Sequence, residues 1–460
     1  MKVTPAKTFL PPVQRLADKA FLAFERFIHV EAMSGIVLLV TTIAALALAN
    51  SPLAADFEQF WHLPLTIGLG DYVFSHSLHF WINDVLMTIF FLVVGMEIRK
   101  EMHDGALADV RSASLPFVGA AGGVILPALM YLALNTDATV RHGWAVPTAT
   151  DIAFAVGILT LLGKAVPSSA RIFLLTLAII DDIVAVLIIA LFYSGGLDVS
   201  GFFIAGGGIL AVFFLQWIGV GSAWAYILPG VLLWYGLLKT GAHPTLAGVV
   251  LGLITPTRQV RKSAPPPELA SEAIIDYVEK KNGSHDLAVL MRPVKRLRYA
   301  QRELLPPVVR IQMILHPWVA FMVMPLFAFA NAGVSFGDVH LSGGGPVTVF
   351  LGVSLGLVFG KPIGVFALSW LSVRMGWCSL PAGMTWSWGV LVGLLAGIGF
   401  TMSMFIANLA FTDQELLNAS KVGILLGTVM AGIVGLVYGR LLIAHRKKKG
   451  GQRGEETCCS

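Results

Sequence analysis

Apolar runs of about 20 residues recur along nearly the whole chain, separated by short polar segments. At 1.5 Å per residue, a helix of that length crosses a hydrocarbon core about 30 Å thick. Since a bilayer offers no hydrogen bonds to the backbone, such runs must be helices. The pattern predicts an all-α polytopic membrane protein with about twelve transmembrane helices. The expected spans are residues 33–50, 79–98, 113–134, 144–162, 172–193, 201–218, 223–238, 244–255, 313–332, 346–371, 386–409 and 422–444.

Composition agrees with a membrane protein. Charged residues make up 13% of the chain and hydrophobic residues 56%, whereas soluble domains carry about 25% charged residues. The net charge of +5 does not indicate nucleic-acid binding, because the basic residues are segregated along the chain. The three cysteines form neither a disulfide framework nor a metal-binding spacing, and no cofactor is expected.

The distribution of Lys and Arg predicts the orientation, because both accumulate in cytoplasmic loops. With twelve spans and both termini inside, the cytoplasmic segments hold 27 of the 32 basic residues. The outside loops hold only Arg141, Lys239 and Lys421. Arg440 lies near the cytoplasmic end of the last span, which leaves Lys361 as the one basic residue placed deep in the membrane. We expect a multi-pass membrane protein with both termini in the cytoplasm.

Three segments are expected besides the helical domain of residues 33–444. Residues 1–32 are predicted to be an amphipathic cytoplasmic segment without a signal-peptide cleavage site, and residues 445–460 a basic cytoplasmic tail. Residues 256–312 form a cytoplasmic insertion, interpreted as a solvated loop in preference to a regulatory element. In the outside loop, residues 63–76 have strand-like content around a Gly turn, which is consistent with a hairpin or with a plain ordered loop.

Ionisable side chains inside a bilayer are functional candidates, because their burial costs several kcal/mol unless they are paired or hydrated. The candidates are Asp151, Asp181, Asp182 and Lys361. Asp181 lies ten residues after Arg171, the cytoplasmic end of its span, which is about 15 Å at helical rise and therefore near the midplane. A lone aspartate could cap a helix, but two adjacent carboxylates at this depth have no simple structural role.

Such a pair is suited to exchanging a cation for protons. Burial and mutual repulsion both favour the neutral acid, so at least one aspartate should hold a proton readily. Sodium prefers carboxylate, hydroxyl and carbonyl oxygens, which makes it a competitor for the same atoms. Competition at a site that faces each side in turn is antiport, and Lys361 can pair with an aspartate when the cation is absent.

Two spans, the fourth and the eleventh, carry residues that interrupt helices. Pro147, Thr148 and Thr150 surround Asp151 in the fourth, and the eleventh contains the glycine-rich run 393–401. A proline removes a backbone hydrogen bond, which frees carbonyls toward a cavity. A glycine-rich run alone would be a weak signal, because helix packing also selects small residues.

Several motifs, in order along nearly the whole chain, resemble the bacterial NhaA-type sodium/proton antiporters. The matching segments are residues 149–155 (ATDIAFA), 177–182 (LAIIDD), 245–249 (TLAGV), 315–320 (LHPWVA), 326–334 (LFAFANAGV), 360–362 (GKP) and 397–403 (GIGFTMS). The resemblance does not cover the tails or the insertion 256–312. Paired interrupted helices are a general pointer to a transporter's binding site, and this family is itself a known case.

The resemblance implies inverted repeats, with the fourth and eleventh helices crossing as broken chains at the midplane. It implies electrogenic, pH-regulated exchange of sodium or lithium for more than one proton, and a homodimer formed through the outside hairpin near 63–76. Carried over by motif, Asp181 and Asp182 would carry the ion and the protons, with Lys361 the partner of Asp181. Thr150 and Asp151 would complete the sodium site.

The resemblance also implies a pH-sensing group. Its members here would be Glu97, Lys100 and Glu101, together with His243. From the residues alone, the first three could equally be an interfacial charge cluster. The family often has a glutamate four residues before His-Pro-Trp, where this chain has Gln312, so one ionisable member of the group is missing.

Two other classes of protein fit parts of the pattern. Gly68-Leu69-Gly70-Asp71 matches the Gly-x-Gly-Asp signature of intramembrane aspartyl proteases, but Asp71 is expected in an outside loop and the membrane aspartates are adjacent on one helix. A cation channel can be lined by carboxylates. A deep lysine beside the acidic pair argues against a channel, because it repels permeating cations.

Overall fold

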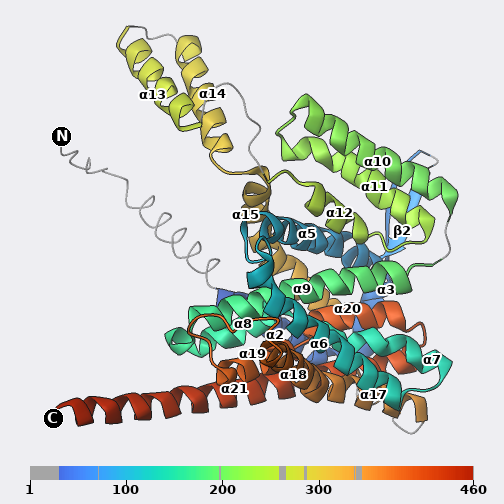
Figure 1. Cartoon of the computed structure of the whole chain (residues 1–460). Coiled ribbons are helices and arrows are strands. Elements are labelled where there is room, and N and C mark those ends of the chain that lie inside the picture. Colours follow the sequence, from blue (N-terminus) through green and yellow to red (C-terminus); the bar gives the residue numbers. More distant parts are fainter. Residues whose placement is uncertain are drawn as a thin grey trace.

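The computed structural model describes residues 31–70, 72–195, 198–257, 266–283, 287–335, 337 and 344–458, so the N-terminal segment lies almost wholly outside the described residues. The described chain is mostly α-helical, with one two-stranded sheet (Figure 1). The predicted fold class, an all-α multi-pass membrane protein, is confirmed at this level. The α-helices are α2 (Glu31–Ala49), α3 (Ala54–His62), α4 (Leu78–Phe80), α5 (Met87–Asp104), α6 (Val110–Leu134), α7 (Ala138–Arg141), α8 (Ile152–Leu161), α9 (Ser168–Phe192), α10 (Val199–Ile218), α11 (Ile227–Thr240), α12 (Leu246–Ile254), α13 (Pro266–Gly283), α14 (Leu287–Glu303), α15 (Pro307–Trp318), α16 (Met324–Asn331), α17 (Gly344–Leu355), α18 (Lys361–Arg374), α19 (Trp386–Ala396), α20 (Phe400–Ala410) and α21 (Gln414–Cys458).

Short 3₁₀ and π turns join several of these helices. The 3₁₀ turns are η2 (His142–Thr148), η3 (Gly163–Ala165) and η4 (Ala223–Tyr226), and the π turns are η1 (Trp81–Leu86), η5 (Val319–Val323) and η6 (Gly356–Gly360). A single π turn inside a helix often marks a functional position. Here η6 ends at the residue before Lys361.

Seven helices in the described part are long and apolar enough to cross a membrane, and ten do so if each strongly bent helix pair counts as one span. The bent pairs are α2 with α3, α7–η2 with α8, and α19 with α20, at 113°, 42° and 44°. The expected spans at 223–238 and 244–255 coincide with α11 and α12, whose lengths of 14 and 9 residues fall short of that test.

The helix that carries the two adjacent aspartates is the most enclosed. In α9, 72% of the most apolar window is buried, a larger share than in any of the other six single spans. Close packing also places α18 against α6, because a Cβ on either Gly122 or Gly364 would overlap the carbonyl oxygen of the other. This glycine contact lies one turn after Lys361 and holds the start of α18 in the protein interior.

Of the two interpretations of residues 63–76, a hairpin or a plain ordered loop, the structure shows the hairpin. Strands β1 (Pro64–Leu69) and β2 (Tyr72–Ser77) pair in antiparallel register, with Pro64 opposite Ser77 and Leu69 opposite Tyr72. Gly70, in the turn, has a φ of 61°, a left-handed conformation that glycine adopts without strain.

The insertion differs from the expected solvated loop, because its described residues form two packed helices. Helices α13 and α14 lie side by side and project away from the body of the protein (Figure 1). Ala273 on α13 and Ala300 on α14 are buried. Because their side chains are small, the two helices can approach closely. Charged residues are frequent in both helices, so the sequence lacked the long apolar run that would have marked them.

Helix α21 begins eight residues before the expected last span, at Gln414 instead of 422. Lys421, expected in an outside loop, therefore lies on a helix and is only 6% exposed. The sequence could not show that Lys421 is helical and buried, because a short polar loop and the first turns of a helix have similar compositions.

Candidate functional site

The two interrupted helices contact each other at their breaks. Residues Ala149–Asp151 separate η2 from α8, and residues Gly397–Gly399 separate α19 from α20. The backbone amide of Asp151 donates to the carbonyl of Ile398 at 2.7 Å. The backbone polar groups freed at one break are thus satisfied partly by the other, as burial in an apolar surrounding requires.

Asp151 connects both breaks through its side chain. Its Oδ1 accepts a hydrogen bond from the amide of Phe154 at 3.1 Å, which caps the N-terminus of α8. Its Oδ2 accepts from the amide and the hydroxyl of Thr401, at 3.1 and 2.5 Å, at the start of α20. With these three hydrogen bonds, the carboxylate of Asp151 holds the starts of α8 and α20 together. The role of Asp151 as a direct sodium ligand stays a prediction.

Thr150 lies within the first break and contacts Asp181 on α9. Its hydroxyl is 2.6 Å from Asp181 Oδ2 and 2.9 Å from the carbonyl of Ala396. A hydroxyl has one hydrogen and two acceptor lone pairs. It donates to an ionised Asp181, and when Asp181 is protonated it can accept from the acid and donate to Ala396.

Lys361 forms an ion pair with Asp181. The Lys361 Nζ lies 2.9 Å from Asp181 Oδ2, and both side chains are 0% exposed. The same ammonium donates to the carbonyl of Thr148, at the end of η2. Lys361 therefore links α18 to α9 and to the break in the fourth expected span, and the predicted pairing of Lys361 with Asp181 has direct geometric support.

Each aspartate of the pair also presents a carboxylate oxygen with no protein partner. Asp181 Oδ1 and Asp182 Oδ1 are buried and accept no hydrogen bond among the described residues. Such atoms are costly to bury as ions unless a proton or a cation occupies them. In the described part of the chain no three His, Cys, Asp or Glu side chains gather as a metal-binding group, so hydroxyl and carbonyl oxygens would have to complete a sodium site.

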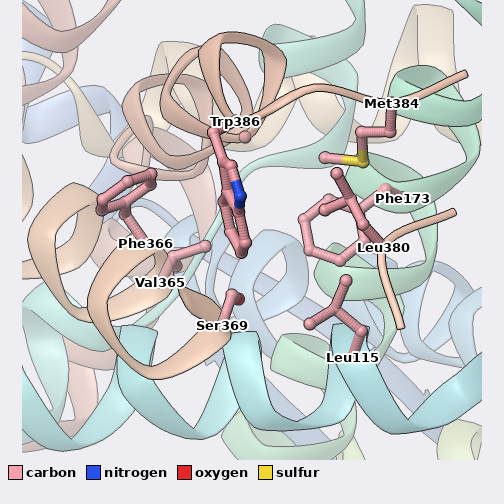
Figure 2. Close-up of a pocket in the computed structure, with 9 residues that line it drawn as sticks. Leu115, Phe173, Val365, Phe366, Ser369, Leu380, Met384 and Trp386 are labelled. Carbon is pink, nitrogen blue, oxygen red and sulfur yellow. The ribbon is translucent and has the colours of Figure 1, made fainter. Parts of the chain in front are cut away.

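The pocket shown in Figure 2 is a different feature. Its lining is apolar apart from Ser369 and includes Phe173 on α9 and Val365 on α18. None of the four ionisable candidates lines it. Hard cations need oxygen ligands, so this pocket is a packing defect and not the cation site.

Comparison with known proteins decides the family. The family model described as "Na+/H+ antiporter 1" matches residues 25–438, which is most of the chain. The chain belongs to this antiporter family. A relative named Na+/H+ antiporter NhaA from Cupriavidus necator is 58% identical over 449 residues, covering 97% of this chain and 96% of that protein. Na+/H+ antiporter NhaA 2 from Pseudomonas putida is 59% identical over 94% of this chain and 96% of its own. A relative from Bartonella tribocorum is 54% identical over 94% of this chain and 95% of its own. No relative named here is a protease or a channel.

The antiporter's predicted pH-sensing residues lie in two places. Glu97, Lys100 and Glu101 lie on the last turns of α5, and Glu97 is near enough to Asp182 to interact with it electrostatically. Glu101 accepts a hydrogen bond from the amide of Ala106 at 2.8 Å. Glu97 thus links the acidic group of α5 electrostatically to the aspartate pair. The role of this group in pH sensing stays a prediction.

His243 is separate from that group. It lies between α11 and α12, and its Nε2 is 2.7 Å from the carbonyl of Tyr193, the residue after α9. Tyr193 follows Asp182 by eleven residues, or about 16 Å of helix. Burial lowers the pKa of His243, and the hydrogen bond to Tyr193 partly opposes that shift.

Sequence reasoning missed a second group of buried polar side chains in the antiporter. Asn331 is 0% exposed and hydrogen-bonds to His79, Asn83 and Asn408. Lys421 is close enough to His79 for an electrostatic interaction.

Asp84 also lies inside the expected span 79–98 and was not counted among the membrane aspartates. A search for asparagine and histidine within the spans, in addition to acids and bases, would have found most of this group.

Proposed function

We propose that this protein exchanges sodium or lithium ions for protons across the bacterial inner membrane, in the service of sodium and pH homeostasis. Membership of the Na+/H+ antiporter 1 family and the names of relatives at 54–59% identity support this exchange. The observation that carries the proposal is the buried group of Asp181, Asp182 and Lys361. The carboxylate of Asp181 is paired with the ammonium of Lys361. Each of the two carboxylates also has one oxygen without a hydrogen-bond partner among the described residues.

Asp182 is the main carrier in this proposal. Its Oδ1 has no hydrogen-bond partner among the described residues, so a proton can neutralise it in one state and a sodium ion in another. A hard cation and a proton prefer the same carboxylate oxygens, and occupation by one therefore excludes the other. This competition couples the two flows without any covalent chemistry.

Asp181 and Lys361 supply the charge imbalance. While sodium is absent, the ammonium of Lys361 neutralises Asp181 at 2.9 Å. When sodium takes over Asp181 and Asp182, Lys361 loses its counter-charge, and a buried unpaired ammonium favours loss of its proton. Release of a proton from Lys361 in addition to one from Asp182 would give more than one proton per sodium, which is electrogenic exchange.

The contacts at the breaks suggest how the site faces each side in turn. The proposed architecture has twelve spans in inverted repeats, both termini in the cytoplasm, and the breaks at Ala149–Asp151 and Gly397–Gly399 crossing near the midplane. Irregular backbone at that depth is tolerated where it lines a site inside the protein. Thr150 touches both α9 and the end of α19, so a movement of the breaks would change the ligands offered to the ion.

A homodimer formed through the β1–β2 hairpin completes the proposal. Leu65, Ile67 and Val73 on the hairpin are 43%, 56% and 64% exposed. The hairpin is a two-stranded ribbon with free edges, and such ribbons gain stability by pairing with another sheet. The association is tested by the mass of the detergent-solubilised protein with and without residues 64–77.

The test of the exchange uses inside-out vesicles with an acidified lumen and a fluorescent pH indicator. Sodium added outside should discharge the proton gradient, and potassium at the same concentration should not. Equal responses to the two ions, or no response to either, would contradict the proposed function. Channel-scale currents across a planar bilayer would favour a channel instead.

A further inference from the structure

The buried carboxamide of Asn331 lies where three membrane spans meet. Asn331 is the last residue of α16, Asn408 lies on α20, and Asn83 lies on η1, just before α5. In the sequence, residues 332–343 follow Asn331, residues 411–413 follow the helix that carries Asn408, and the hairpin precedes Asn83. All three segments are outside in the orientation proposed above. The group therefore lies at the outside end of the protein.

Asn331 uses every hydrogen-bonding group of its side chain. Its Oδ1 accepts from Asn408 Nδ2 at 2.7 Å, from His79 Nε2 at 3.1 Å and from Asn83 Nδ2 at 3.3 Å. Its Nδ2 donates to Asn83 Oδ1 at 2.8 Å and to the carbonyl of Phe327 at 2.9 Å. A single side chain thus joins α20 to α16 and to the segment before α5. Satisfied polar groups in an apolar surrounding favour one arrangement strongly, since breaking it leaves several of them unpaired.

Three aromatic rings pack together on the helices next to this group. The ring centroids of Phe91 and Phe405 are 5.2 Å apart, and those of Phe327 and Phe405 are 6.2 Å apart. All three side chains are at most 3% exposed. They come from α5, α16 and α20, the three segments that Asn331 connects. Along α16 and α20, Phe327 and Phe405 precede Asn331 and Asn408 by about one turn, so the rings form an apolar layer next to the asparagines.

The order of residues along α20 relates this layer to the proposed site. Thr401, which binds Asp151, is followed after one turn by Phe405 and after a further three residues by Asn408. Residues seven positions apart lie on one face of a helix, so Thr401 and Asn408 share a face. A shift of α20 at its break would therefore move Phe405 away from the other two rings and Asn408 away from Asn331 at the same time.

We propose that Asn331 is a positioning residue of the exchange, whose hydrogen bonds hold the outside path to the aspartates closed and must break for the site to open outward. This inference rests on the proposed function. It also assigns the group a role other than cation binding. The buried ammonium of Lys421 interacts electrostatically with His79, and a positive charge beside the asparagines disfavours a resting cation there.

The test compares the sodium KM at the two faces of the protein, measured in right-side-out and inside-out vesicles at equal pH. The affinity at each face is reduced by the fraction of protein that is closed to that face, so the ratio of cytoplasmic to outside KM reports the balance between the two states. For Asn331→Ala, this ratio should rise about fivefold, the size expected from the loss of one net hydrogen bond in the outside-closed state.

Asn135→Ala is the matched control. Asn135 is also a buried asparagine at the outside end, where it donates to the carbonyls of Tyr131 and Thr348 and joins α6 to α17. Its replacement should lower the melting temperature without changing the KM ratio. If Asn331→Ala does not fold, Asn408→Ala removes only the 2.7 Å contact and should raise the ratio in the same direction.

Three outcomes would overturn the proposal: an unchanged ratio in the folded variant, a fall in the ratio, or an equal rise in the Asn135→Ala control. Sodium-driven discharge by the parent protein in the same vesicles is measured alongside. A parent protein without that activity would refute the proposed exchange itself, which separates the two failures.

Discussion

The ammonium of Lys361 lies 2.9 Å from Asp181 Oδ2 with both side chains fully buried. Removing one member of such a pair leaves the other without a counter-charge, which typically costs about 3–5 kcal/mol. The pair also links two spans, because Lys361 begins α18 and Asp181 lies in the middle of α9.

Replacing Lys361 with alanine should therefore lower thermal stability and alter the coupling of the exchange. The loss should be larger at high pH, where an unpaired Asp181 is ionised, than at low pH, where a proton can neutralise it. The measurements are melting curves at several pH values and the current per sodium transported. Lys361→Arg keeps the charge and should retain more stability. An alanine variant equal to the parent in both measurements would contradict a charge-balancing role.

The hydroxyl of Thr150 should contribute to sodium affinity. It is within hydrogen-bond distance of both Asp181 Oδ2 and the carbonyl of Ala396. The hydroxyl can therefore keep a hydrogen bond when Asp181 is protonated and turn a lone pair toward sodium when the ion is bound. Thr150→Val keeps the shape and removes the hydroxyl, and the sodium KM should rise about tenfold if a hydrogen bond to a charged group is lost. Thr150→Ser should restore most of the affinity. Equal KM values for the valine and serine variants would exclude a role for the hydroxyl.

Gln312 should influence the pH at which transport begins. It lies on α15, which packs against α5, the helix that carries Glu97 and Glu101. Gln312→Glu would add a negative charge, which favours the protonated forms of nearby carboxylates. Activation of the parent should therefore begin at lower pH, or rise less steeply, than activation of the variant.

The pH profiles of sodium-dependent proton release should be compared at low and high salt. The difference should shrink with added salt, because partly exposed charges are screened over a Debye length of about 8–10 Å. Superimposable profiles at low ionic strength would show that position 312 has no electrical effect.

His243 should make the stability of the protein sensitive to mild acid. Burial lowers its pKa from the ordinary value of 6.5, so the folded state favours the neutral imidazole that donates to Tyr193. The unfolded chain then binds more protons than the folded one just below pH 6.5. The stabilising effect is complete above that pH and declines as the pH falls through it toward the lowered folded value.

His243→Gln removes this titration. The parent should lose more melting temperature than the variant between pH 7.5 and pH 5.5, both chosen to bracket the ordinary value of 6.5. A parent curve parallel to that of the variant would show that His243 titrates alike in the folded and unfolded chains. The histidine's role in the pH response of transport is tested by the same variant in the vesicle assay.

Much of the proposed site could be predicted from the sequence. A charge inside the membrane is rare and costly, so Asp181, Asp182 and Lys361 stood out, and the structure gathers Asp181 and Lys361 in one ion pair. The strand-like content and Gly turn of residues 63–76 indicated a hairpin as one of two alternatives, and the structure shows it. These features depend on local composition or on a strong energetic penalty.

Other features could not be predicted, because they depend on tertiary contacts. Asn331 carries no charge, and although its place in an apolar run marks it as a buried polar residue, the sequence does not show which three side chains it bonds to. Lys421 was assigned to a loop because the first turns of α21 are polar. The insertion was recognised as helix-compatible, but the packing of α13 against α14 was not predicted, because it depends on contacts between the two helices and not on a long apolar run.

The central claim is that sodium and protons compete for Asp182, whose Oδ1 is buried without a protein partner. The most direct test is sodium-driven recovery of indicator fluorescence in proteoliposomes containing purified Asp182→Asn. Asp198→Asn serves as the control, because Asp198 caps α10 at the surface and asparagine caps equally well. The account predicts no sodium response from Asp182→Asn at any pH and a normal response from Asp198→Asn. A response near that of the parent from reconstituted Asp182→Asn would contradict the claim.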